Sequence, residues 1–265
     1  MRKGKYLILA IGFSLIFCVG CHRVADAVID GVVDGTSRAA SDKAEQEVYE
    51  SLAPKGEVPA PQTQQWNFYM ATHARVLFNY TFAPGGVWVS RQDYQPGEYT
   101  KYQSEREDEE TDMIIEKAFL EKLDNGNEWW RVSWKDDEEK VIYEALIDTS
   151  GQMIKLLAQD SEGNKGEIRV QGQRIYRRPN KVSDQEINQS RVETETVSTP
   201  AGTFETDKIK YTAITNEGQD SMTWWLSPEI PGGVVKYQFH DDNERVWNAV
   251  LIEKGQGAER KLTSF

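Results

Sequence analysis

The feature that most constrains the fold is a regular series of short strand-like runs from residue 97 onward. The runs are rich in β-branched and aromatic residues, and clusters of Asn, Asp, Gly and Ser separate them, as at 124–127. Strands joined by such short connections pair as antiparallel neighbours, because a parallel pair needs a longer crossover. The expected strands are 99–104, 113–123, 128–135, 140–147, 153–159, 166–170, 190–198, 204–216, 220–227, 233–240 and 245–254.

Two segments of this part of the chain are expected to be helical. The aromatic stretch from Trp66 to Phe82 has no clear strand or helix periodicity, and we favour a helix over 64–78. Residues 183–189 predict a short helix, because Ser183 and Glu186 have the spacing of a capping box.

Several strands carry large apolar side chains on both faces. Trp129 and Trp130 are consecutive in one strand, as are Trp224 and Trp225 in another, so each pair points to opposite faces. A sheet with one solvated face would alternate apolar and polar residues, so something must cover the second face. The candidates are the segment that begins at Trp66, the short helix, a lipid-like ligand or another protein. These five tryptophans are candidate contacts for a ligand or partner, and core packing is the alternative.

The first 21 residues have the pattern of an export signal. Arg2, Lys3 and Lys5 precede an apolar run of about 14 residues, which is shorter than the ~20 residues of a membrane-spanning helix. A small residue and then Cys21 follow the run, and this ending resembles the lipobox of bacterial lipoproteins. In that family the cysteine is lipidated and becomes the mature N-terminus. We therefore predict a signal peptide at 1–20 and lipidation of Cys21.

The lipobox resemblance also implies a location. Cys18 stands where the family usually has Leu, so an ordinary secretory signal cut near Gly20, or an uncleaved anchor, is the alternative. His22 follows Cys21, and by the sorting rule of enteric bacteria a residue other than Asp there implies the outer membrane, facing the periplasm. Both cysteines of the chain lie in this region, which leaves the mature body without a thiol for disulfides or metal binding.

A lipid-anchored helix and a linker are expected between the signal and the sheet. Residues 21–52 contain no proline and many alanines, and a stripe of small residues repeats at every fourth position. Such a stripe allows close approach of another helix, and the alternative is a poorly stable tether. The prolines of 53–65 indicate an extended linker, and 66–265 would form the β-domain. The predicted helix-packing face consists of Ala27, Gly31, Gly35 and Ala39.

Charge and motifs exclude several functions. The net charge of -12 disfavours nucleic acid as a partner, because an acidic surface repels phosphates. The chain has only three histidines and contains none of the common motifs for nucleotide binding, ester hydrolysis or zinc proteolysis. We predict no metal, no cofactor and no enzymatic activity.

Two short sequences resemble a known group. These are the turn 199–204 (Thr-Pro-Ala-Gly-Thr-Phe) and the stretch 224–236, which begins Trp-Trp-Leu-Ser-Pro and continues through Pro231-Gly232-Gly233. Together they are similar to bacterial envelope proteins of the LolA/LolB-like and DUF3108-like type. The resemblance implies an unclosed β-barrel, a strongly curved antiparallel sheet with helices plugging its concave side. In that group the best-understood members hold acyl chains or lipoproteins in the cavity.

Three functions are compatible with these observations. The leading hypothesis is a lipid-anchored cell-envelope binding protein that offers a hydrophobic concave surface to an acyl chain, a lipoprotein or an apolar partner. The second is a structural or assembly lipoprotein that acts through self-association of its N-terminal helix and an acidic docking surface. The third is a carbohydrate-binding or glycoside-active envelope protein, because eight tryptophans would suit stacking on sugars.

Overall fold

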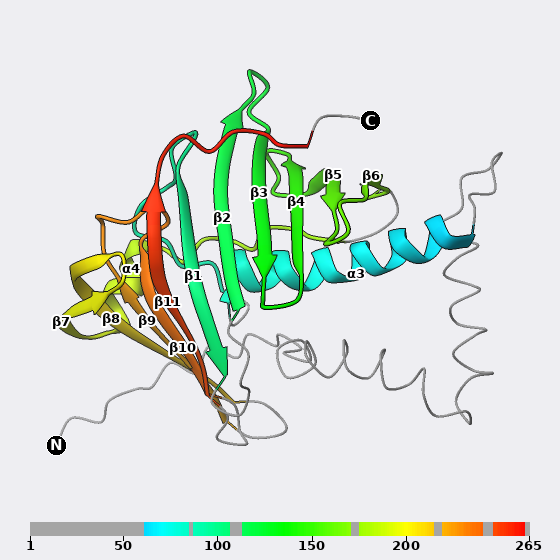
Figure 1. Cartoon of the computed structure of the whole chain (residues 1–265). Coiled ribbons are helices and arrows are strands. Elements are labelled where there is room, and N and C mark those ends of the chain that lie inside the picture. Colours follow the sequence, from blue (N-terminus) through cyan, green and yellow to red (C-terminus); the bar gives the residue numbers. More distant parts are fainter. Residues whose placement is uncertain are drawn as a thin grey trace, which may run out of the picture.

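The computed structural model describes residues 61–84, 87–106, 113–170, 175–214, 219–240 and 246–262. Within these ranges the chain forms an 11-stranded antiparallel sheet and the helices α3 and α4 (Figure 1). The sheet is not closed, because β6 (Lys165–Ile168) stands at one end of the strand order and β7 (Arg191–Thr199) at the other. The predicted mainly β fold, an unclosed and curved antiparallel sheet with helices, is therefore confirmed.

The strand boundaries agree with the expected ones to within about two residues. The strands are β1 (Tyr99–Arg106), β2 (Met113–Lys122), β3 (Glu128–Lys135), β4 (Lys140–Ile147), β5 (Met153–Gln159), β6 (Lys165–Ile168), β7 (Arg191–Thr199), β8 (Gly202–Ile214), β9 (Gln219–Leu226), β10 (Val234–His240) and β11 (Val246–Gly255).

The sheet consists of two meanders, β1–β6 and β7–β11. They join where β1 pairs with β11, from Tyr99 opposite Gly255 to Arg106 opposite Trp247. The chain thus starts in the middle of the sheet, runs out to the β6 edge, and returns to the middle from the β7 edge. The segment 175–190, here called the passage segment, belongs to the connection between the β6 edge and the β7 edge.

Helix α3 (Pro61–Phe82) lies along one face of the first meander, the inner face (Figure 1). Its fully buried Met70, Ala74 and Phe78 pack against inner-facing side chains of β2–β6. Proline is well tolerated at the first helical position, where its missing N–H would have no partner. Residues 61–65, which we assigned to the linker, are therefore helical, and the helix is longer than expected at both ends.

The C-terminal segment 256–262 covers the opposite, outer face of the same strands. Its Ala258 and Leu262 pack against Trp129 and its buried neighbours on β2, β4 and β5. The buried carboxylate of Glu144 accepts the backbone N–H groups of Lys261, at 2.6 Å, and of Leu262, at 3.1 Å. The sequence predicted a cover for the second face, but we did not identify this segment as one.

Helix α4 (Asp184–Gln189) has the predicted capping box. The Ser183 side chain accepts the backbone N–H of Glu186, and the Glu186 carboxylate accepts the N–H of Ser183. Its buried Ile187 packs into the core of the second meander, together with Phe204 and Trp224. The short helix is therefore one of the covers that the two-faced strands required.

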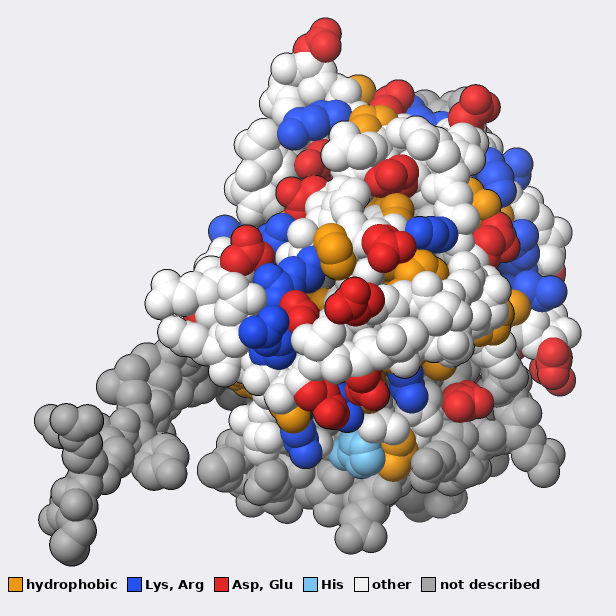
Figure 2. All heavy atoms as spheres, turned by 90° about the vertical axis from the view of Figure 1, so that its left-hand side faces the viewer, with side chains coloured by type: hydrophobic (Ala, Val, Ile, Leu, Met, Phe, Trp, Pro, Cys, Tyr) orange, Lys and Arg blue, Asp and Glu red, His pale blue; other side chains and the backbone are white. Residues whose placement is uncertain are grey.

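The side of the molecule that carries β7, β8 and α4 has interspersed charges rather than a single-sign field (Figure 2). Ion pairs join Lys208 to Glu193 and Arg191 to Asp207 on these strands. Across the described ranges, no helix is both long enough and apolar enough to cross a membrane.

Several predictions lie outside the described residues. They are the signal peptide 1–20, the lipidation site Cys21, the N-terminal helix with its small-residue face, and the linker up to residue 60. All of these stay predictions.

Candidate functional site

A cavity of about 440 Å³ lies where the two meanders join. Its walls come from the end of α3, the loop 87–97, strands β1–β3, β9 and β10, and the passage segment. The volume falls in the ~300–1,000 Å³ range of small-molecule sites. Its large apolar lining residues are Phe82, Trp88, Val89, Tyr94, Tyr102, Ile115, Phe119, Trp130, Trp224, Val234 and Tyr237.

Trp130 organises an aromatic wall of this cavity. Its ring stacks on Phe119, with 4.7 Å between the centroids. The rings of Phe82 and Tyr94 meet it edge-on at 5.1 and 5.3 Å. Offset-stacked and edge-to-face pairs are favourable aromatic geometries, so this wall is well packed without a ligand.

A lysine stands in the middle of this aromatic wall. Lys117 lies on β2 between Ile115 and Phe119 of the inner face, and it is only 9% exposed. Its ammonium nitrogen is 4.0 Å from the centroid of the Phe82 ring, 5.2 Å from that of Tyr94 and 5.5 Å from that of Trp130. Ring faces attract a cation, but they accept no conventional hydrogen bond.

The charge of Lys117 has no ionic partner among the described residues, where its ammonium makes neither a hydrogen bond nor an ion pair. Burial, and to a smaller extent the nearby positive charge of Arg178, together lower the pKa of this amine to about 7. A buried cation without a hydrogen-bonding partner is costly, so its presence in a cavity makes Lys117 a candidate functional residue.

Arg178 brings a second positive charge to the same rings. Its Nη2 donates to Glu128 Oε2 at 2.8 Å, and Trp130 Nε1 donates to the same oxygen at 3.0 Å. Its guanidinium carbon lies 5.1 Å from the centroid of Trp88 and 5.4 Å from that of Trp130. Within the described structure, three buried polar atoms of the lining lack a hydrogen-bond partner: Thr81 Oγ1, Arg178 Nε and Trp224 Nε1.

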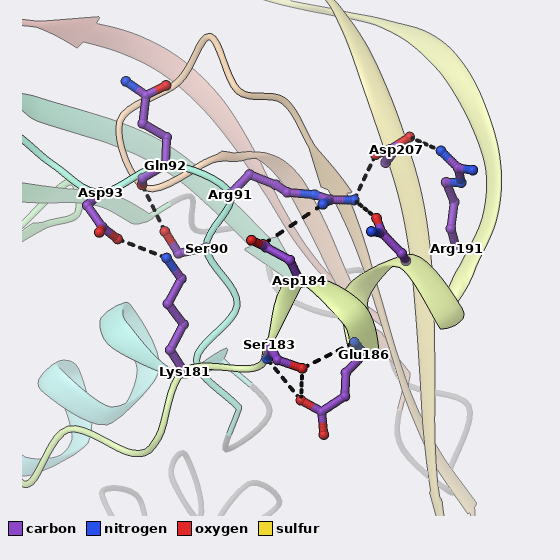
Figure 3. A network of polar contacts seen from close by, with 11 residues as sticks. Ser90, Arg91, Gln92, Asp93, Lys181, Ser183, Asp184, Glu186, Arg191 and Asp207 are labelled. Carbon is purple, nitrogen blue, oxygen red and sulfur yellow. Dashed lines mark hydrogen bonds and ion pairs between the residues drawn. The ribbon is translucent and has the colours of Figure 1, made fainter.

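A polar network fixes the loop 87–97 as the outer wall of the cavity (Figure 3). Arg91 donates to Asn188 at 2.8 Å and to Asp207 at 2.9 Å, which ties the loop to α4 and β8. Lys181 pairs with Asp93 at 2.9 Å, so the passage segment holds the other end of the loop.

The predicted Gly232-Gly233 bend allows this loop to sit close to the turn between β9 and β10. Both glycines have φ of +78°, a conformation that other residues rarely adopt. A Cβ atom on Gly233 would lie 2.6 Å from the backbone nitrogen of Arg91, and one on Gly232 would lie 2.5 Å from the Tyr94 ring. The cavity wall therefore depends on two residues that have no side chain.

The cavity brings together two of the five candidate tryptophans, one from each consecutive pair. Trp130 and Trp224 line it. Trp129 is on the outer face, where the guanidinium of Arg260 lies 3.8 Å from the centroid of its ring.

The other two candidates also lie away from the cavity. Trp225 points to the opposite side of β9 from Trp224, and its Nε1 donates to Glu195 at 2.6 Å. Trp66 packs over Gly166 at the β6 edge, and its Nε1 donates to Asp160 at 2.6 Å.

The histidines of the described ranges, His73 and His240, do not line the cavity. His73 of α3 lies 2.9 Å from the Tyr143 hydroxyl, and burial lowers its pKa to about 4, which keeps it neutral. No group of three or more His, Cys, Asp or Glu side chains within the described ranges could hold a metal ion.

The sequence contained a signal for Lys117 that we missed. On the inner face of β2 the alternate residues are Met113, Ile115, Lys117 and Phe119, so one lysine interrupts an apolar series. For Arg178 there was no such signal, because it lies outside any strand.

Comparison with known proteins does not identify a family for this chain. No protein-family model and no curated protein matches the chain. A solved structure from Parabacteroides distasonis, described as a "putative lipoprotein", has 15% identity and a TM-score of 0.32, and the match covers 63% of this chain and 98% of that one. One from Bacteroides fragilis, a "putative exported protein" with a YmcC-like fold, has 17% identity and a TM-score of 0.33, covering 63% and 99%. Likenesses this slight carry no conclusion about family or function.

Proposed function

We propose that the protein is a cell-envelope binding protein that holds an apolar ligand in the cavity between its two meanders. In this proposal Cys21 is lipidated and attaches the protein to the outer membrane, with the β-domain facing the periplasm. The ligand is an acyl chain, free or as part of a lipid or lipoprotein, as the resemblance to LolA/LolB-like and DUF3108-like proteins implies.

The cavity itself carries the proposal. Helix α3 fills the inner side under β2–β6, but it ends at Phe82, and about 440 Å³ remains between its end and the second meander. Aromatic and aliphatic side chains, prolines included, make up more than half of the lining, and six charged side chains make up much of the rest. Apolar walls with placed polar groups are typical of a ligand site. A purely structural protein would gain stability by filling such a space.

The test uses the chain without residues 1–21, none of which belongs to the described fold. The chain is exported behind the signal peptide of a secreted protein that is not lipidated, purified from the periplasm of a bacterial host and analysed by native mass spectrometry. The same sample is extracted for lipid analysis. We expect a population heavier than the bare chain, with an acyl compound in the extract.

A matched variant assigns the bound mass to the cavity. Val234→Trp would place a larger side chain in the lining, whereas Val192→Trp would change an exposed residue of β7. The proposal predicts that only the first variant loses the bound mass. A bare chain from every preparation, with no binding when acyl compounds are added, would contradict the proposal.

A further inference from the structure

The cavity has the opposite charge to the protein as a whole. The chain carries a net charge of -12, yet four basic side chains, Lys117, Lys122, Arg178 and Lys181, line the cavity against two acidic ones. Both acidic side chains already have partners, since Asp93 pairs with Lys181 and Glu128 with Arg178. The remaining positive charge therefore has no counter-ion among the described residues.

Lys117 and Arg178 line the same cavity and lie near the same two aromatic rings. The Lys117 ammonium lies 4.0 Å from the centroid of Phe82 and 5.5 Å from that of Trp130, and the Arg178 guanidinium carbon lies 5.8 and 5.4 Å from the same two centroids. Two cations over shared rings repel one another, and the repulsion lowers the pKa of Lys117. An anion bound in the cavity near both cations would relieve that repulsion and supply the missing hydrogen-bond acceptor for Lys117.

We propose that the cavity selects amphiphiles with a single anionic head group, a carboxylate or a phosphate, which contacts Lys117 and Arg178 while the apolar chain lies along the aromatic wall. This inference rests on the proposed function and names the chemical class of its ligand. The head group would accept hydrogen bonds from the Lys117 ammonium and from the guanidinium of Arg178, both of which line the cavity. The aromatic rings around Lys117 exclude water, and this strengthens such charge-assisted bonds.

The test compares ligands that differ only in their head group. Decanoate, decyl phosphate and the neutral decanol are titrated below their aggregation concentrations into the delipidated chain lacking residues 1–21, at about pH 6.5, with inorganic phosphate as a fourth ligand. Isothermal titration calorimetry gives the affinities. We expect the affinity of both anionic amphiphiles to be at least about tenfold higher than that of decanol, as for hydrogen bonds to a charged group. Inorganic phosphate should bind far more weakly than either.

Variants then assign the preference to the lysine. Lys117→Met keeps an unbranched side chain of similar length, and it should bring the affinities of decanoate and decanol to within about twofold of each other without weakening decanol. Lys140→Met is the control, because Lys140 is an exposed residue at the start of β4 and is not part of the lining. Circular dichroism melting of each variant confirms that it is folded.

The outcomes separate this inference from the proposed function. Equal binding of decanoate and decanol, or a preference that survives in Lys117→Met, would overturn the head-group inference and leave the acyl-binding proposal intact. Inorganic phosphate that binds as tightly as decyl phosphate would show a site for free anions and would also overturn the inference. Failure of all the amphiphiles to bind would contradict both proposals.

Discussion

At the scale of single residues, the position of Lys117 gives the most information about function. Its neighbours across the sheet are the buried Thr100 on β1 and Val132 on β3, so it occupies a core position of the inner face. An apolar residue there would avoid the cost of taking a charge out of water. A costly residue of this kind is typical of a site whose function opposes stability.

This position predicts that Lys117→Met stabilises the ligand-free protein, and more so at low pH. Below about pH 7 the folded chain buries a protonated amine and bears the full cost. Between the folded pKa of about 7 and the unfolded value of 10.5, the folded amine is neutral and the unfolded one is protonated, so the cost shrinks as pH rises. The gain should be about 2–4 kcal/mol near pH 6 and smaller near pH 9.

Urea unfolding at the two pH values measures this difference. Lys140→Met serves again as the control, and its stability should change by less than about 0.5 kcal/mol at either pH, as for most surface substitutions. A Lys117→Met variant that is less stable than the parent protein at pH 6 would show that the amine is well compensated in the folded state.

At the scale of elements, local patterns explain why the strands were predictable. In β3, β4 and β5 the alternation of side chains and the flanking turns gave boundaries that match the structure at both ends. Helix α3 was less predictable, because Pro61 reads as part of a linker until the helix is seen to start with it. The C-terminal segment lacks any periodic pattern, so nothing local indicated that it packs on the outer face.

That segment provides an element-scale prediction. Glu144→Gln should lower the free energy of unfolding by about 1–3 kcal/mol, because an amide group can accept through one oxygen only and leaves the N–H of either Lys261 or Leu262 without its present partner. Hydrogen exchange of residues 258–262 should become faster in the variant, and urea unfolding gives the energy.

The control for this prediction is the same substitution in an exposed ion pair. Glu193→Gln on β7 removes one of the two carboxylate partners of Lys208, the other being Glu195, and should cost less than about 1 kcal/mol. Equal losses in the two variants would mean that Glu144 does not hold the C-terminal segment in place.

At the scale of the whole molecule, the cavity follows from topology. Because β1 and β11 pair in the middle of the sheet, the two meanders curve around one inner space, with α3 under the first and α4 under the second. The space left between them is the cavity. No single element determines it, and its lining comes from residues as distant along the chain as Phe82 and Tyr237.

The attachment of the whole molecule to a membrane is testable through its two cysteines. Cys21→Ser removes the predicted lipidation site, so the protein should no longer be labelled when cells are grown with a fatty-acid analogue. Cys18→Ser should remain labelled, because only Cys21 directly follows the small residue of the lipobox-like sequence. Labelling that persists in Cys21→Ser and disappears in Cys18→Ser would contradict the predicted lipidation site.

The sequence by itself determined the class of fold, because strand length, turn chemistry and side-chain alternation are local properties. It also determined that both sheet faces must be covered, since Trp129 and Trp130 cannot share a face. Only the tertiary structure decided what covers each face and which tryptophan of each pair meets the cavity. Those outcomes depend on contacts between distant segments, such as Arg178 against Trp130, and on a buried lysine whose cost appears only once the rings of Phe82 and Tyr94 surround it.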